Sequence, residues 1–85
     1  MLKYYYRNNS FPVIWDNYWG SYRVNSEMAI QIALQQIPGK VVKVELDYED
    51  GVLVYEVYIL TTYGLYEVKI NANTGQIFEI EKEDD

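Results

Sequence analysis

The dipeptide Asp50-Gly51 lies between two segments in which apolar and polar residues alternate. Asp-Gly favours a two-residue β-hairpin loop, because such a loop needs positive φ and these residues tolerate it. With this loop, the apolar residues of the two segments face one another in pairs: Tyr48 with Leu53, Leu46 with Tyr55, Val44 with Val57, and Val42 with Ile59. A slip of one residue would set charges opposite these apolar side chains. The turn and the pairing therefore predict the same hairpin.

A helix is predicted before this hairpin. Ser26 is a good N-cap residue, and Glu27 suits the positive end of a helix dipole. Apolar residues then recur at helical spacing and form one stripe: Ile30, Ala33, Leu34 and Ile37. Pro38-Gly39 ends the helix, because proline disfavours helical geometry in the residue before it and glycine takes the reversed turn.

Two more strands are predicted after the hairpin. A loop at Tyr63-Gly64 would pair Ile59 with Val68 and Val57 with Ile70, and Asn73-Thr74-Gly75 is a further turn. In residues 76–81, Phe78 and Ile80 alternate with glutamates. The sequence thus predicts an α+β fold, with one N-terminal α-helix packed on a four-stranded antiparallel β-meander. We expect three segments: an aromatic-rich segment (1–25), the domain (26–82) and an acidic tail (83–85).

The second face of the predicted sheet mixes charged and apolar residues. It carries Lys43, Glu45, Asp47, Glu56, Glu67 and Lys69 beside Val54, Tyr58, Leu60 and Leu65. The register sets Glu45 opposite Glu56, an unfavourable like-charge pair unless Lys43 or Lys69 reaches it. This face is too apolar for plain solvent surface and too charged for a second core, so we expect something to cover it.

The composition argues against catalysis. The chain has 85 residues, no His and no Cys, so the thiol nucleophile, the imidazole base and the usual zinc ligands are all missing. Asp47, Glu49 and Asp50 could together bind a hard cation, but their spacing lacks a calcium-loop pattern and fits a solvated strand face better. We therefore expect no enzyme activity, no cofactor and no metal.

The charge distribution limits the partners. The formal net charge is −6; residues 1–25 carry +2, from Lys3, Arg7 and Arg23 against Asp16, which leaves −8 for residues 26–85. Nucleic acids and anionic membranes are held by Lys and Arg, so an acidic domain argues against both. No apolar run approaches the ~20 residues of a membrane span. We expect a protein partner, or a second copy of the chain.

Residues 1–25 hold eight of the fourteen aromatic residues without a clear period. In one hypothesis this segment folds over the half-apolar sheet face as structural cover. In the other it stays exposed as a docking surface, because Trp and Tyr are favoured binding anchors. Both hypotheses give the same candidate partner-binding residues, which are Trp15, Tyr18, Trp19, Tyr22, Val54, Tyr58 and Leu65.

The motifs of residues 26–81 resemble the PepSY domain of peptidase propeptides and cell-envelope proteins. The resemblance rests on the capped helix that begins Ser26-Glu27-Met28-Ala29, on the strand Tyr55-Glu56-Val57, and on the turn Asn71-Ala72-Asn73-Thr74-Gly75. This chain departs from the family pattern at Asn71 and Asn73, where charged residues are frequent. Residues 1–25 lie outside the resemblance.

The resemblance implies a non-catalytic protein-binding module that inhibits or modulates a secreted peptidase at the bacterial cell envelope. It implies no catalytic or cofactor residues. Residues 1–10 lack the apolar stretch of a signal peptide, so either the protein is cytoplasmic or a leader was removed. The resemblance implies an extracytoplasmic setting, which would fit a leader removed before Lys3. The alternative is a structural module that forms a homodimer, or docks a neighbouring domain, through its exposed sheet face.

Overall fold

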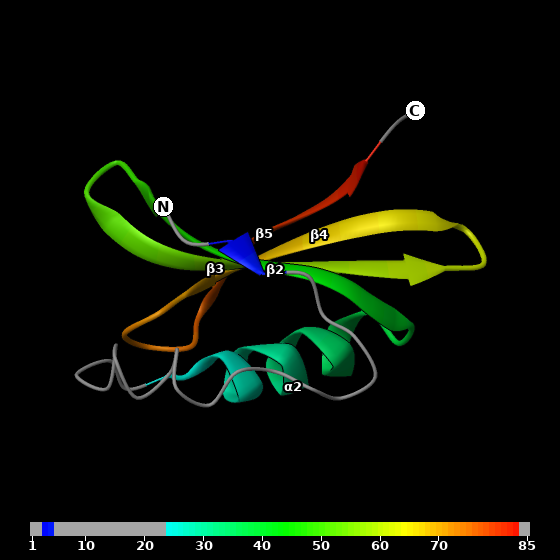
Figure 1. Cartoon of the computed structure of the whole chain (residues 1–85), viewed down its shortest axis with the longest axis horizontal. Coiled ribbons are helices and arrows are strands. Elements are labelled where there is room, and N and C mark those ends of the chain that lie inside the picture. Colours follow the sequence, from blue (N-terminus) through cyan, green and yellow to red (C-terminus); the bar gives the residue numbers. More distant parts are fainter. Residues whose placement is uncertain (1–2, 5–23, 84–85) are drawn as a thin grey trace.

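One α-helix lies on one face of an antiparallel sheet (Figure 1). The computed structural model describes residues 3–4 and 24–83. Its elements are β1 (Lys3–Tyr4), α2 (Ser26–Gln36), β2 (Lys40–Glu49), β3 (Val52–Thr61), β4 (Gly64–Asn71) and β5 (Ile77–Glu83). The strand order β1-β2-β3-β4-β5 contains the expected four-stranded meander, so the predicted fold class is confirmed. The two-residue strand β1, which has no alternating pattern to reveal it, adds to the β2 edge.

The β2–β3 hairpin closes at Asp50 and Gly51, whose φ angles are 55° and 80°. Three of the expected pairs are confirmed: Tyr48 with Leu53, Leu46 with Tyr55, and Val44 with Val57. The fourth was wrong, because a bulge between Val41 and Lys43 sets Val41 opposite Ile59. The extra residue turns Val41 into the core, where it is 5% exposed, and leaves Val42 half-buried.

The β3–β4 turn was expected one residue too late. Thr61 pairs with Gly64, so the loop is Thr62 and Tyr63. The Thr61 hydroxyl decides this position: it accepts a hydrogen bond from the Tyr63 N–H at 2.9 Å and donates one to the Gly64 carbonyl at 3.0 Å. The pairs become Val57 with Val68, Ile59 with Tyr66, and Tyr55 with Ile70. The register differs by two residues, and an even shift keeps the same side chains on the core face.

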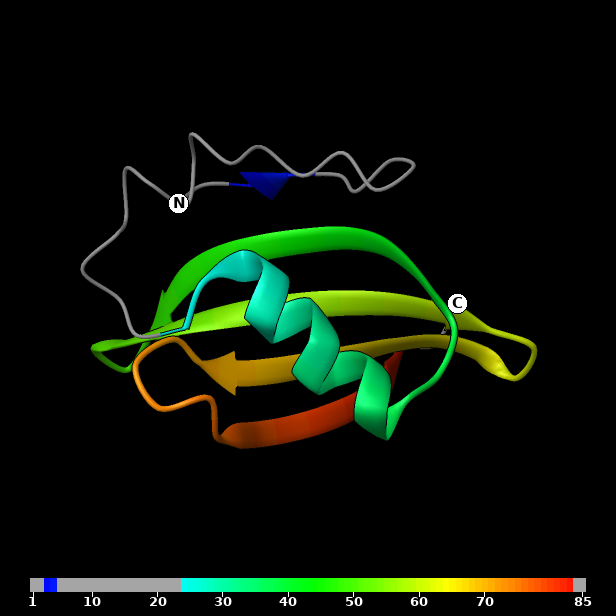
Figure 2. The same cartoon turned by 90° about the horizontal axis from the view of Figure 1, so that it is seen from below.

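Helix α2 crosses the sheet diagonally (Figure 2). Its N-cap is Asn25, not Ser26: the Asn25 side chain accepts a hydrogen bond from the Met28 N–H at 2.8 Å, while Ser26 is fully buried. Ala29 and Ala33 are wholly buried, and these small side chains allow the helix to lie close on the sheet. The predicted stripe does face the core, with Ile30 buried and Leu34 and Ile37 packed at its margin.

The core lies between α2 and strands β2, β3 and β4. Its fully buried members include Val44, Leu46, Tyr55, Val57, Ile59, Val68 and Ile70. Strand β5 contributes less than expected, because a register shift between Lys69 and Ile70 pairs Ile70 with Ile77. Ile77 packs against the core, whereas Phe78 and Ile80 are 52% and 42% exposed. The helix thus covers the middle of the sheet and leaves the β5 edge open.

Candidate functional site: the open face of the sheet

The sheet face turned away from α2, here called the open face, carries most of the charged strand residues. The register aligns them across the sheet in two rows. The first row runs Glu45, Glu56, Lys69, Glu79 from β2 to β5. The second row runs Lys43, Tyr58, Glu67, Glu81. Strand β1 adds Lys3 at the register position opposite Glu45.

Three glutamates of these rows are buried, although α2, the helix that the structure describes, lies on the opposite face of the sheet. Glu45, Glu56 and Glu67 are 8%, 6% and 7% exposed. Charged carboxylates are almost never this buried unless they are paired, because the charged form loses its hydration. Their protonation and their partners therefore decide what this face can bind.

Glu45 has its own partners. It accepts a hydrogen bond from the Tyr58 hydroxyl at 3.3 Å, and the Lys43 ammonium lies 3.8 Å away. The same ammonium lies 4.4 Å from the centre of the Tyr58 ring, within range of a cation–π contact. Burial, followed by the nearby carboxylates, raises the pKa of the Tyr58 hydroxyl, so Tyr58 stays a hydrogen-bond donor. Of the two lysines that could offset the Glu45–Glu56 pair, Lys43 reaches Glu45.

Lys69 bonds to the outer carboxylates instead. Its ammonium lies 3.1 Å from Glu49 and 3.7 Å from Glu79. The hydrogen bond with Glu49 raises the pKa of Lys69, so the ammonium stays charged. Glu56 lies directly opposite Lys69 in the register, but among the described residues it forms no ion pair with it.

Glu56 and Glu67 consequently hold protons at higher pH than an ordinary glutamate. Burial, reinforced by a hydrogen bond with Glu49, raises the pKa of Glu56 to about 8. Burial, reinforced by a hydrogen bond with Glu83, raises the pKa of Glu67 to about 7. The Glu49 pKa is lowered in turn, first by its bond with Glu56 and then by Lys69, so the proton of that pair belongs to Glu56.

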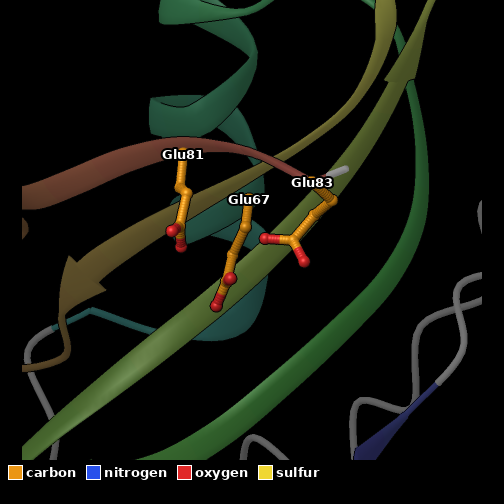
Figure 3. A group of neighbouring side chains, drawn as sticks. All are labelled: Glu67, Glu81 and Glu83. Atoms are coloured by element: carbon orange, nitrogen blue, oxygen red, sulfur yellow. The ribbon is translucent and has the colours of Figure 1, made fainter. Parts of the chain in front are cut away.

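Glu67, Glu81 and Glu83 gather at the β4–β5 side of the open face (Figure 3). Their carboxylate oxygens lie within 4.8 Å of one another. Hard cations such as Ca²⁺ take oxygen ligands of this kind. The cluster alone does not make a metal centre, because neighbouring acidic groups are common without a bound ion, and burial followed by a hydrogen bond with Glu83 raises the pKa of Glu67 to about 7. The earlier candidates Asp47 and Glu49 have other partners: Asp47 accepts from the Tyr48 N–H at 2.8 Å, and Glu49 bonds to Lys69.

The candidate partner-binding residues fall into three groups. Tyr58 and Leu65 line the same pocket of about 440 Å³, together with Val42, Lys43 and Glu83. Val54 lies on the same face, opposite Asp47 of β2 and Asn71 of β4. Its side chain is buried, with only 1% of it exposed. Trp15, Tyr18, Trp19 and Tyr22 lie outside the described residues.

A family model decides what kind of domain this is. The model of the PepSY family, described as peptidase propeptide and YPEB domain, matches residues 23–81. The chain belongs to the PepSY family. This confirms the resemblance inferred from the motifs, and domains of this family are protein-interaction modules that are generally non-catalytic.

Two further similarities support the PepSY assignment. The chain is 39% identical over 62 residues to the uncharacterized protein YkoJ of Bacillus subtilis (strain 168), a match that covers 72% of this chain and 36% of YkoJ. It also resembles the crystal structure of a "putative lipoprotein" from Clostridium difficile 630, with a TM-score of 0.69 and 28% identity, over 71% of this chain and 40% of that one. The chain therefore spans well under half the length of either relative.

The PepSY domain has a second pocket that sequence analysis did not find. Its volume is about 620 Å³, and it opens where the end of α2 meets the β3–β4 turn, lined by Ile37, Pro38, Gly39, Leu60, Thr61, Thr62, Tyr63 and Tyr66. Its walls come from two places far apart in the sequence, the end of α2 and the β3–β4 turn, and no sequence pattern shows that these two segments meet. No helix in the described part of the chain is long and apolar enough to cross a membrane.

Proposed function

We propose that this PepSY domain is a non-catalytic protein-binding module that modulates a secreted peptidase at the cell envelope. Membership of a family described by its peptidase propeptides supports the peptidase as the partner. The similarity to a "putative lipoprotein" supports the extracytoplasmic location. The absence of His and Cys from the sequence supports action by binding instead of catalysis.

The observation that carries this proposal is the composition of the open face. A pocket lined by Tyr58 and Leu65 lies beside buried carboxyl groups, on the sheet face that α2 leaves uncovered. Protein interfaces combine aromatic anchors with hydrogen-bonding groups in this way. We propose Tyr58 and Leu65 as contact residues, and that Trp15, Tyr18, Trp19 and Tyr22 act on the same face, as its cover or as further anchors. We further propose that residues 26–82 form the independent module.

The test is the rate at which a thermolysin-type metallopeptidase hydrolyses a short fluorogenic peptide, measured with increasing amounts of the domain. We expect the rate to fall and then to saturate. Leu65→Ala should weaken this effect, because it removes apolar contact area from the pocket. Met28→Ala is the matched control, since Met28 is 46% exposed on the helix, away from the open face. Equal inhibition by both variants, or none by the unmodified domain, would refute the proposal.

The second candidate is a structural module that docks a neighbouring domain. It is favoured by the length of the relatives, of which this chain covers 36% and 40%. Pairing two copies through the open face is less favourable, because it would bring two rows of carboxyl groups together. Light scattering after size exclusion tests the homodimer form of this candidate: we expect a monomer at all concentrations, and a stable dimer without effect on peptidases would support assembly instead of peptidase binding.

A further inference from the structure

Strand β5 is the weakest attachment in the sheet. Among the described elements it pairs only with β4, and most of its residues are exposed. Phe78 and Ile80, the apolar residues in its middle, are about half exposed, which leaves Ile77 as its contribution to the core. Exposed edge elements with few buried contacts open more readily than the rest of a domain. The side-chain contacts between β5 and β4 therefore influence how often β5 opens.

On the open face, β5 is joined to β4 through carboxyl groups. Glu67 of β4 lies opposite Glu81, and the neighbouring Leu65 lies opposite Glu83. The side chains of Glu67, Glu81 and Glu83 extend to the same side of the sheet (Figure 3), with oxygens within 4.8 Å. Glu67 is 7% exposed, so water does little to screen it. Three negative charges at this spacing would repel one another.

We propose that a proton held between Glu67 and Glu83 fastens β5 to β4, and that its loss above neutral pH loosens β5. In the protonated state one carboxyl donates to the other, which gives the two strands a side-chain hydrogen bond beyond the backbone ladder. In the deprotonated state the bond is lost and repulsion replaces it. An opened β5 exposes the backbone donors and acceptors of β4, to which an extended partner segment can pair.

The groups around Glu67 do not cancel this charge. From β3, Tyr58 lies opposite Glu67 and Glu56 lies beside it; from β2, Lys43 and Glu45 continue the two rows. On β4, Lys69 attracts Glu67, but its ammonium bonds to Glu49 and to Glu79 of β5. From β5 come Glu79, Glu81 and Glu83. Carboxyl groups thus outnumber lysines around Glu67.

The direction of the effect follows from linkage. Burial and the bond with Glu83 raise the pKa of Glu67 to about 7, above the value of 4.5 that a free glutamate has. A carboxyl group that keeps its proton when the strand is closed and loses it when the strand opens favours the closed state at low pH. This contribution is complete below about pH 4.5 and is lost as the pH rises through about 7. Mild acid therefore closes β5, and alkaline pH loosens it.

Amide hydrogen exchange measured by NMR tests whether the proton between Glu67 and Glu83 holds β5 to β4. Protection factors of the β5 amides are compared at pH 5.5 and pH 8, corrected for intrinsic exchange, with EDTA present to remove cations that would neutralise the cluster. We expect the protection of β5 to fall at least about tenfold, the change expected for one titrating group over one pH unit. In Glu67→Gln, which cannot ionise, the fall should disappear.

Glu79→Gln is the matched control on the same strand and face. It removes a contact with Lys69 and lowers protection at both pH values, but the fall between them should remain. If Glu67→Gln does not fold, Glu83→Gln takes its place, because it removes the other partner of the shared proton. Protection of β5 that is independent of pH in the unmodified chain would overturn the proposal, as would an unchanged fall in the Glu67 or Glu83 variant.

Discussion

Gly39 joins the end of α2 to β2 at a place where the chain touches β3. A Cβ atom there would lie 2.6 Å from the Leu60 carbonyl oxygen and 2.7 Å from the Ile59 side chain. The Leu60 carbonyl belongs to the backbone of β3, which cannot move aside as a flexible side chain can. The residue is therefore required for its size, whereas Gly51 of the hairpin turn has no neighbour within 4 Å and is required for its φ of 80°.

Replacing Gly39 by Ala should lower the free energy of unfolding by about 1–3 kcal/mol, because the added methyl group would overlap the backbone of β3. Urea denaturation followed by circular dichroism measures the change. Gln35→Ala, on the exposed surface of α2, is the control and should change stability by less than about 0.5 kcal/mol. A Gly39→Ala variant as stable as this control would show that the contact with β3 is looser than described.

Asn25 begins α2 through its side chain, which accepts the Met28 N–H at 2.8 Å. We expect Asn25→Ala to destabilise the domain by about 1 kcal/mol, because one amide at the helix end loses its partner. Asn25→Asp keeps the acceptor and should keep the stability. Thermal melts of the two variants distinguish them; equal melting temperatures would mean that Ser26 caps the helix after all.

At the scale of the elements, the helix protects β4 much better than β5. Val68 and Ile80 lie directly opposite each other on these strands, yet Val68 is fully buried and Ile80 is 42% exposed. Val68→Ala should therefore cost about 2–3 kcal/mol, and Ile80→Ala less than about 1 kcal/mol, although Ile80 loses more atoms. Equal losses in chemical denaturation would show that something covers β5.

The sequence predicted elements best where two signals agreed. The β2–β3 hairpin had both a turn dipeptide and matching apolar residues, and its central pairs are confirmed. The bulge could not be predicted, because Val41 and Val42 are both apolar and alternation does not choose between them. Likewise, Ile77 and Phe78 are adjacent apolar residues, and only the register shift beside Ile70 decides which of them packs inside.

The open face was predicted in outline but not in its chemistry. Alternation placed Glu45 opposite Glu56, and the structure has this pair. The burial of the two side chains, 8% and 6% exposed, could not be predicted, because alternation gives the face of the sheet and not the depth of a side chain in it. The raised pKa of Glu56 follows from that burial. The sequence therefore located the face, but not the burial that raises the pKa of Glu56.

For the whole molecule, Glu56 makes stability depend on pH. Its pKa of about 8 lies above the ordinary value of 4.5, so the folded state keeps a proton that the unfolded chain loses. This contribution is complete below about pH 4.5 and is lost as the pH rises through about 8. The lowered pKa of Glu49 acts only below pH 4.5 and does not oppose it in this range.

We expect the chain to lose on the order of 2 kcal/mol of stability between pH 5.5 and pH 8.5, since one group contributes up to about 1.4 kcal/mol per pH unit. Urea titrations at several pH values measure this. Glu56→Gln should make the curve less steep and leave the part that Glu67 contributes, whereas Glu27→Gln, exposed on the helix, should leave the slope unchanged. A stability that rises with pH across this range would show that Glu56 is already charged near neutrality.

The central claim is that this PepSY domain binds a protein partner through the face that α2 does not cover. Mapping NMR chemical shifts while an inactivated thermolysin-type metallopeptidase is added tests it most directly. We predict shift changes at Lys43, Tyr58 and Leu65, and none at the exposed helix residues Gln31 and Gln35. Changes confined to α2, or no binding at any concentration, would contradict the claim.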